Sequence, residues 1–335
     1  MGKLKSAFAA AAAAALMNLA ATNAWADPAT LPLVDPDYRA AAPHLSLSIT
    51  SDKDMQGFQN PEDKARKANP KLEILDIGGM ELRIFRPRVS EGKAMPVVYY
   101  CHGGGYLLRR AYYAAGYQRL ADTYGAAIVL PRYRTSMEAP FPAQLEDAAR
   151  GLRHIYLHGT ELSLDSSRIA VMGDSAGGGL AASLALWNRD HDAIPLAAQI
   201  LVYPMLDFRT GTKDDRFKAR DTGEILWNRP TNAFAWCKLK GGQQLSKEEL
   251  GYFSPSYAAD LHSLPPALIY VGTLDLFVNE DIEYANRLIA SGVTTELHVI
   301  PGLYHGFDAA NHKARKTADF IGTVKRALSK AFAQE

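Results

Sequence analysis

The sequence predicts an α/β protein: a mostly parallel sheet of eight strands with helices on both faces, and a helical insertion over the carboxyl edge of the sheet. Three observations support this prediction. The chain has 335 residues, 47% of them hydrophobic, which is enough for one large domain with an insertion. Beyond residue 71, strand-like segments alternate with segments of helical periodicity. One segment, 206–253, has no strand pattern and mixes charged with aromatic residues.

The first 26 residues have the three parts of a secretory signal peptide. Lys3 and Lys5 give a basic start, residues 7–16 form an apolar run, and Ala24-Trp25-Ala26 is a small-x-small cleavage site. The alternatives are an uncleaved membrane anchor and an alanine-rich helix. The apolar run is short, however, for a membrane span of about 20 residues. We therefore expect an exported protein, periplasmic or secreted, without a stable membrane anchor.

The next segment, residues 27–70, is rich in proline and mixed in charge. This composition predicts an extended lead-in with a helix or two, one of them near residues 63–68, and no core element.

From residue 71 onward the pattern becomes that of a folded sheet with its helices. Two runs around Gly78-Gly79, residues 72–77 and 82–85, predict a hairpin. The further strands are expected at 96–101, 126–130, 168–172, 198–203, 267–271 and 295–300, several of them apolar enough to be buried on both faces. Helical spacing predicts helices at 113–124, 142–158, 180–187, 280–290 and 313–333.

Charge and cysteine content exclude several classes of protein. The formal net charge is +1 and no block of like charge occurs, so nothing points to nucleic acid or to an anionic surface as a partner. The two cysteines, Cys101 and Cys237, are too few for a disulfide-rich scaffold, and neither has metal-ligand spacing. Because Cys101 ends an apolar strand and Cys237 lies in a different region, we do not expect them to pair. The oligomeric state, including a homodimer, is left open.

Residues 169–179, Ile-Ala-Val-Met-Gly-Asp-Ser-Ala-Gly-Gly-Gly, join a predicted strand to a predicted helix through one serine. This is the layout of a nucleophile elbow, in which Ser175 occupies a strained turn above the end of the sheet. Gly173 and Gly177, two residues to either side, let the backbone pass where a Cβ would clash. The alternative is an ordinary strand–helix turn capped by Ser175, because the pattern G-x-S-x-G is short enough to occur by chance.

A catalytic serine also needs a base, a group that orients the base, and donors for an oxyanion. Asp275 and His305 each lie in a loop after a predicted strand, and the chain order is Ser, Asp, His. Among nine histidines, only His102 and His305 lie in glycine-containing loops after strands. His102 is expected to hold its loop in place, whereas His305 is the candidate base.

The run His102-Gly103-Gly104-Gly105 directly follows a predicted strand and is the candidate source of oxyanion donors. Its bare backbone allows two N–H groups to aim at one oxygen, and the Ala176 N–H would be a third donor. The alternatives are a flexible glycine loop or a phosphate cradle, although no Walker-type Gly-Lys-Ser/Thr is present.

These motifs together resemble the bacterial hormone-sensitive-lipase-like esterases. The resemblance covers residues 97–307 and rests on 102–105, 173–178, 275–280 and 304–307, with further similarity at 133–147 and 254–267. It implies the α/β-hydrolase fold with a helical cap, hydrolysis of a small-molecule carboxylic ester, and neither cofactor nor metal. By this resemblance the nucleophile is Ser175, the general base is His305, and Asp275 orients the base. The implied oxyanion donors are Gly103, Gly104 and Ala176, with Gly105 as an alternative.

The resemblance also divides the chain and leaves some questions open. After the signal peptide at 1–26, it implies cap segments at 27–70 and 206–253, and a catalytic domain at 71–205 and 254–335. The sequence departs from the family at 106–110 and at 135–139, which puts bulk and charge near the pocket entrance and leaves local loop packing open. Short- to medium-chain acyl esters are the expected substrates. Amide, lactone or carbamate hydrolysis and a non-catalytic ligand-binding role are the alternatives. Three cap aromatics could line the acyl pocket or form the cap core: Trp227, Phe234 and Trp236.

Overall fold

The computed structural model describes residues 28–56, 72–89, 94–109 and 114–333. The expected signal peptide and the helix predicted near residues 63–68 lie outside these described residues. Within the described ranges, no helix has the length and hydropathy that a bilayer crossing requires.

The described chain forms one eight-stranded sheet, as the sequence predicts, with the strand order β1-β2-β4-β3-β5-β6-β7-β8. The first two strands form the predicted hairpin, and β2 is also antiparallel to β4. All the other neighbouring strands are parallel. The strand bounds are β1 Glu73–Asp76, β2 Glu81–Phe85, β3 Met95–Cys101, β4 Ala127–Pro131, β5 Leu164–Asp174, β6 Ala198–Val202, β7 Ala267–Gly272 and β8 Thr295–Ile300.

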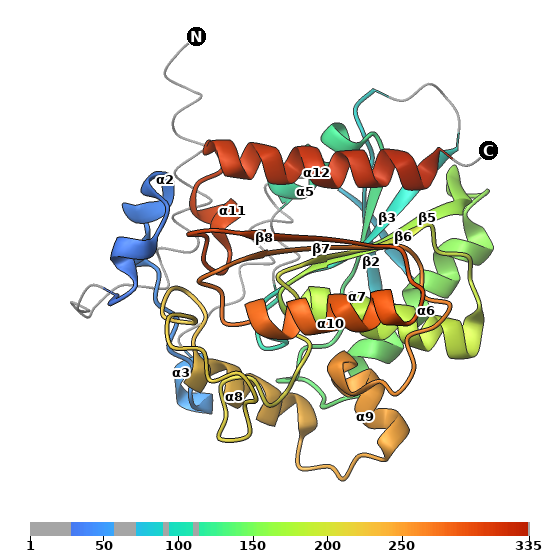
Figure 1. The fold of residues 1–335 in the computed structure, drawn as a ribbon. Coiled ribbons are helices and arrows are strands. Elements are labelled where there is room, and N and C mark those ends of the chain that lie inside the picture. Colours follow the sequence, from blue (N-terminus) through green and yellow to red (C-terminus); the bar gives the residue numbers. More distant parts are fainter. Residues whose placement is uncertain (1–27, 57–71, 90–93, 110–113, 334–335) are drawn as a thin grey trace.

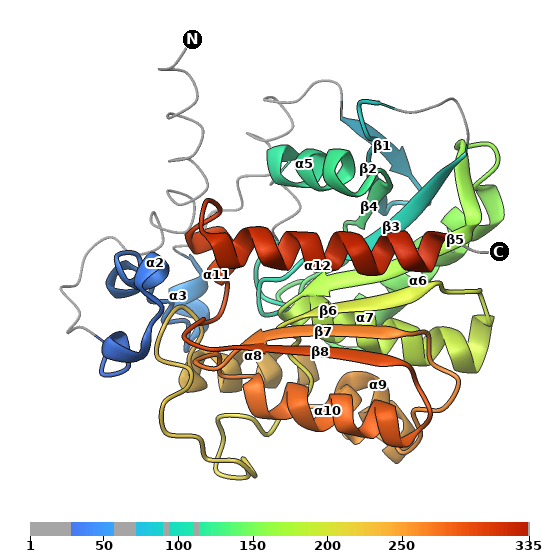
Figure 2. The same ribbon diagram turned by 45° about the horizontal axis from the view of Figure 1, so that its top comes forward.

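Helices cover both faces of the sheet, which confirms the predicted three-layer arrangement. Figures 1 and 2 show α5 (Ala114–Tyr124) and α12 (Arg315–Phe332) on one face. The opposite face carries α6 (Ala143–His158), α7 (Ala176–Trp187) and α10 (Val278–Ala290). Of these, α7 is buried from Ala176 to Leu186, as expected for a helix that is apolar on every side.

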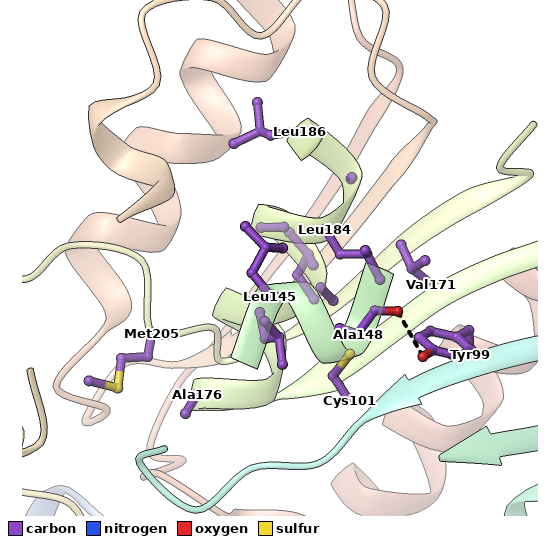
Figure 3. Close-up of a cluster of buried hydrophobic side chains, with 14 of the residues drawn as sticks. Tyr99, Cys101, Leu145, Ala148, Val171, Ala176, Leu184, Leu186 and Met205 are labelled. Carbon is purple, nitrogen blue, oxygen red and sulfur yellow. Dashed lines mark hydrogen bonds between the residues drawn. The ribbon is translucent and has the colours of Figure 1, made fainter. Parts of the chain in front are cut away.

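The sheet separates two apolar cores, and the side chains of β3, which alternate between them, show why. Val97, Tyr99 and Cys101 belong to the core under α6 and α7, whereas Val98 and Tyr100 belong to the core under α12. Successive side chains of a strand point to opposite faces, so this buried strand contributes to both cores. The Tyr99 hydroxyl donates a hydrogen bond to the carbonyl of Ala148, 2.8 Å away, and thereby ties β3 to α6 (Figure 3).

The amino-terminal segment differs from the prediction, because residues 28–49 do contribute to the core. Tyr38 and Ile49 are fully buried, and Val34, Leu45 and Leu47 are nearly so. The prediction of no core element is therefore wrong for this part of the segment. Its apolar residues follow neither a helical nor a strand period, since they fill gaps between elements made elsewhere in the chain. The segment forms only short pieces of helix: η1 Leu31–Leu33, α2 Pro36–Arg39, η2 Ala42–His44 and α3 Asp52–Gln56.

Two boundaries near the predicted elbow also differ from the sequence prediction. The strand β5 begins at Leu164 rather than Arg168, because Leu164 pairs with Met95 before the register shifts. The helix α7 begins directly after Ser175 rather than at Leu180. Further short helical elements are η3 Asn188–Asp192, η4 Pro255–Tyr257 and α11 Phe307–Ala310.

The segment 206–253 contains the helices α8 (Arg229–Lys240) and α9 (Lys247–Phe253) and no strand. It is joined to the amino-terminal segment by backbone and side-chain contacts. Ser46 pairs with Leu226 in an isolated parallel bridge, and the buried Thr231 hydroxyl bonds to the backbone of Leu47 and Ile49. Figure 1 shows α3 and α8 side by side at the lower left of the view.

Candidate active site

The structure brings Ser175, His305 and Asp275 into one hydrogen-bonded chain, although they are up to 130 residues apart in sequence. The His305 Nε2 atom lies 2.9 Å from Ser175 Oγ, and His305 Nδ1 lies 2.8 Å from Asp275 Oδ2. An ionised carboxylate only accepts hydrogen bonds, so the proton belongs on Nδ1. The Nε2 atom is then left as an acceptor that faces the serine hydroxyl, which is the arrangement of a nucleophile and its base.

Ser175 lies between β5 and α7 with φ 57° and ψ −126°, a conformation that costs a non-glycine residue roughly 1–3 kcal/mol. Its hydroxyl makes no capping bond to α7, a helix that lies wholly within the described residues, so the simple helix-cap alternative fails. The tight turn depends on its glycines. A Cβ at Gly177 would lie 2.1 Å from the carbonyl oxygen of Cys101, and one at Gly173 would lie 2.1 Å from that of Gly177.

The imidazole of His305 is enclosed by aromatic rings from three separate loops. Tyr203, after β6, and Phe277, after β7, present their rings at steep angles to it, with centroid distances of 4.7 and 5.3 Å. Trp227, from the 206–253 segment, lies 6.2 Å away. Asp275 is fully buried, and the backbone N–H of Phe277 donates to its other carboxylate oxygen. The pair is therefore held away from bulk water, where its electrostatic interaction is strong.

The glycine loop after β3 lies beside the elbow, as predicted, but its first N–H already has a partner. The N–H of Gly103 donates to the Asp174 carboxylate at 3.0 Å, and the Tyr100 hydroxyl donates to the same oxygen at 2.9 Å. By contrast, the N–H groups of Gly104 and Gly105 donate to no other described residue. Among the candidate donors, Gly104 and Gly105 therefore lack a described acceptor, whereas Gly103 has one. This bond argues against Gly103 as an oxyanion donor and favours the alternative, Gly105.

His102 holds this loop, in line with the role expected from sequence. Its imidazole is fully buried and stacks on the ring of Tyr133 at 4.4 Å. Its Nδ1 atom lies 2.8 Å from the Gly103 carbonyl, and the Tyr133 hydroxyl donates to the His102 carbonyl. Sequence reasoning missed the role of Asp174, although an acidic residue directly before the serine was a visible signal.

The two departures from the family pattern pack against each other. The Ser136 N–H donates to the Tyr106 carbonyl at 2.8 Å, and Arg109 forms an ion pair with Glu138. Although burial opposes ionisation of Glu138, the hydrogen bonds from Arg109 and Thr135 outweigh it and lower the pKa of Glu138. The two unusual segments therefore form one connected unit beside the glycine loop.

Two buried carboxyl groups stand behind the candidate triad, at the start of α10. Burial raises the pKa of Glu280 well above its usual value, with a further contribution from Asp207. Burial raises the pKa of Asp281 as well, with Glu280 and Asp275 adding to the effect. Glu280 accepts the N–H groups of Leu206 and Asp207, whereas neither carboxyl oxygen of Asp281 bonds to another described residue.

The two cysteines do not pair, as the sequence predicts. Cys101 is buried, Cys237 is exposed, and both are free thiols. In the described ranges, no group of three or more His, Cys, Asp or Glu residues is arranged to hold a metal ion. A surface groove of about 480 Å³ between the end of α7 and α9 contains none of the predicted site residues.

Comparisons with known proteins identify the family of this chain. Residues 98–309 match a protein family described as alpha/beta hydrolase fold. The chain is 31% identical to the esterase LipI of Mycobacterium tuberculosis over 286 residues, which is 82% of this chain and 88% of that protein. It is 33% identical over 262 residues to the carboxylesterase NlhH of the same species, covering 74% and 78% of the two chains.

Solved structures give the same result. A bacterial heroin esterase superposes with a TM-score of 0.79 and 31% identity, covering 91% of this chain and all of that one. The esterase LipW of Mycobacterium marinum superposes with a TM-score of 0.78 and 27% identity, covering 92% and 99%. The resemblance inferred from the motifs is thus confirmed, and the chain belongs to the α/β-hydrolase-fold family, among the hormone-sensitive-lipase-like esterases.

Proposed function

We propose that this protein is a serine carboxylesterase that cleaves short- to medium-chain acyl esters through an acyl-enzyme intermediate. The observation that carries the proposal is the continuous chain from Ser175 Oγ through His305 to Asp275, beside open N–H donors. The relatives with 31% and 33% identity are named an esterase and a carboxylesterase, which supports ester hydrolysis as the reaction.

The first half-reaction forms the acyl-enzyme. His305 Nε2 takes the proton of the Ser175 hydroxyl as Oγ attacks the carbonyl carbon of the ester. The negative charge that develops on the carbonyl oxygen is stabilised by the N–H groups of Gly104, Gly105 and Ala176. Each such donor typically contributes about 3–4 kcal/mol to the stability of the transition state. The tetrahedral intermediate then collapses, the bond to the alkoxy oxygen breaks, and His305 protonates the departing alcohol.

The second half-reaction uses the same groups with water in place of the alcohol. His305 removes a proton from water, the hydroxide attacks the acyl carbon, and Ser175 leaves with the proton returned by His305. Asp275 keeps the imidazole in one tautomer and stabilises the imidazolium formed in each step. The groups named here need no metal or cofactor for these proton transfers.

The proposed preference for small, soluble esters follows from the burial of the catalytic side chains. Ser175 and His305 are only 4% and 5% exposed, and Trp227 from the 206–253 segment lies over the glycine loop. In this proposal, residues 27–70 and 206–253 together form a cap over the catalytic domain, 71–205 and 254–335. Such a pocket suits soluble esters better than emulsified fat. Export to the periplasm or beyond belongs to the proposal as well, on the signal-like first 26 residues.

The test is a panel of substrates for the purified protein. Nitrophenyl esters of increasing acyl length are compared with a nitroanilide and a lactone of matched acyl size. We expect the highest kcat/KM for short or medium esters, with far slower amide and lactone cleavage. Faster cleavage of the amide or the lactone would replace esterase with a different hydrolase function. No turnover of any substrate would favour a non-catalytic binding role.

A further inference from the structure

We propose that Trp227 determines which alcohols the enzyme can release, because its indole closes the part of the pocket that receives the alkoxy group. This inference rests on the proposed esterase function. It adds a specificity residue that lies outside the triad and outside the oxyanion loop.

The indole of Trp227 lies against two parts of the candidate machinery at once. A Cβ built on Gly105 would be 2.2 Å from the Cη2 atom of Trp227, so the tip of the six-membered ring touches the oxyanion loop. The same ring system lies 6.2 Å from the imidazole of His305, measured between ring centroids, at an interplanar angle of 37°. Trp227 is 3% exposed, so the ring fills this space rather than covering it loosely.

The geometry of acyl transfer identifies the group that meets this wall. The tetrahedral carbon carries Ser175 Oγ, the oxyanion, the alkoxy oxygen and the acyl chain. The oxyanion lies at the N–H groups of the glycine loop. The alkoxy oxygen must lie within hydrogen-bond reach of His305 Nε2, because that atom delivers its proton. The alkoxy group therefore leaves the carbon between the loop and the imidazole, beside the indole. The acyl chain takes the remaining direction, away from the base.

Hydrogen bonds fix the ring in this position. The indole N–H of Trp227 donates to the side-chain oxygen of Asn232 at 3.0 Å. Asn232 is fully buried, and its amide nitrogen donates to the carbonyl of Thr210 at 2.7 Å. On the other side, the N–H of Leu226 donates to the carbonyl of Leu45 at 2.8 Å. The indole is thus held through its own N–H and through the backbone of the residue before it. We therefore expect it to set a rigid limit on the size of the alkoxy group.

Two substrate series separate the alcohol side from the acyl side. One series keeps the acetyl group and varies the alcohol through ethyl, butyl and cyclohexyl acetate. The other keeps ethanol and varies the acyl group through ethyl acetate, butyrate and hexanoate. Hydrolysis is followed by titration of the released acid, which avoids a bulky chromogenic alcohol. The readouts are two ratios of kcat/KM: cyclohexyl to ethyl acetate, and ethyl hexanoate to ethyl acetate.

In the Trp227→Ala variant we expect the alcohol ratio to rise about tenfold or more, since removal of a pocket wall admits the larger group. The acyl ratio should stay within about twofold of the parent. Trp227→Phe should shift the alcohol ratio in the same direction by a smaller factor. The matched control is Trp187→Phe, a tryptophan at the far end of α7 that stacks on His191. It should leave both ratios unchanged.

An unchanged alcohol ratio in Trp227→Ala would overturn the proposal, as would a change confined to the acyl ratio. If Trp227→Ala does not fold, Trp227→Phe decides the question, and an alcohol ratio equal to that of the parent counts against it. Failure of the underlying esterase function gives a different result, because the parent protein itself would then hydrolyse none of these esters, or Ser175→Ala would retain the ester turnover of the parent. The two failures are therefore distinguishable.

Discussion

Replacing Asp275 with asparagine tests the role of the buried carboxylate with little change in shape. In the native protein Asp275 Oδ2 lies 2.8 Å from His305 Nδ1, and the residue is fully buried. An asparagine that turns its NH₂ toward Nδ1 moves the imidazole proton to Nε2. That nitrogen can then no longer accept the serine proton. We expect kcat to fall about 10⁴-fold, as the same substitution does in serine proteases, which corresponds to about 5 kcal/mol of transition-state stabilisation.

The assay is initial-rate hydrolysis of a short ester by Asp275→Asn, with thermal unfolding to verify that the variant is folded. Asp308→Asn is the matched control, because Asp308 is a nearby carboxylate that accepts from the Tyr203 hydroxyl at 2.7 Å rather than from His305. The control should keep kcat within about threefold, since asparagine still offers an acceptor oxygen. If the folded Asp275→Asn variant retained kcat within tenfold of the parent, Asp275 would not be the group that orients His305.

Two further predictions concern stability. Burial raises the pKa of Asp281, so its carboxyl stays protonated in the folded chain above the pH, about 4, at which it ionises in the unfolded chain. Between the pKa of Asp281 in the unfolded chain and its higher pKa in the folded chain, the stability of the parent should therefore fall by about 1.4 kcal/mol per pH unit relative to Asp281→Asn. Urea unfolding at pH 4 to 7 measures this difference, and a constant difference would contradict the reasoning. Thr231→Val removes the hydroxyl that bonds to Leu47 and Ile49 and should lower the free energy of unfolding by roughly 1–3 kcal/mol. The exposed control Thr160→Val should change it by less than about 0.5 kcal/mol, and equal effects of the two would argue against the link.

Most of the sheet could be predicted because its strands are short apolar runs with clear local signals. The hairpin around Gly78-Gly79 and all six later strands were found within a few residues of their observed positions. The first part of β5 could not be predicted, since residues 165–167 are polar and Leu164 joins the sheet only through its pairing with Met95. The core role of Tyr38 and Ile49 was equally hidden. Their partners lie on elements far along the chain, such as Thr317 and Thr231.

The residues of the candidate site could be predicted from sequence where they directly follow a strand. Ser175, Asp275 and His305 each follow a parallel strand, so their side chains meet at one edge of the sheet. Which glycine N–H groups could serve as oxyanion donors could not be predicted, because this depends on a hydrogen bond between Gly103 and Asp174. The position of Trp227 could not be predicted from sequence either. It is set by the fold of a segment that has no regular period and by a buried bond to Asn232.

The most direct test of the proposed mechanism is to find where the acyl group is bound during turnover. The protein is mixed with nitrophenyl acetate, quenched in acid within the first turnover, digested and analysed by mass spectrometry. We predict one acetyl group on the peptide that contains Ser175, with a matching burst of nitrophenol. Ser175→Ala should show neither the adduct nor the burst. An acetyl group on another residue, or undiminished ester turnover by the folded Ser175→Ala variant, would contradict the assignment of Ser175 as the nucleophile.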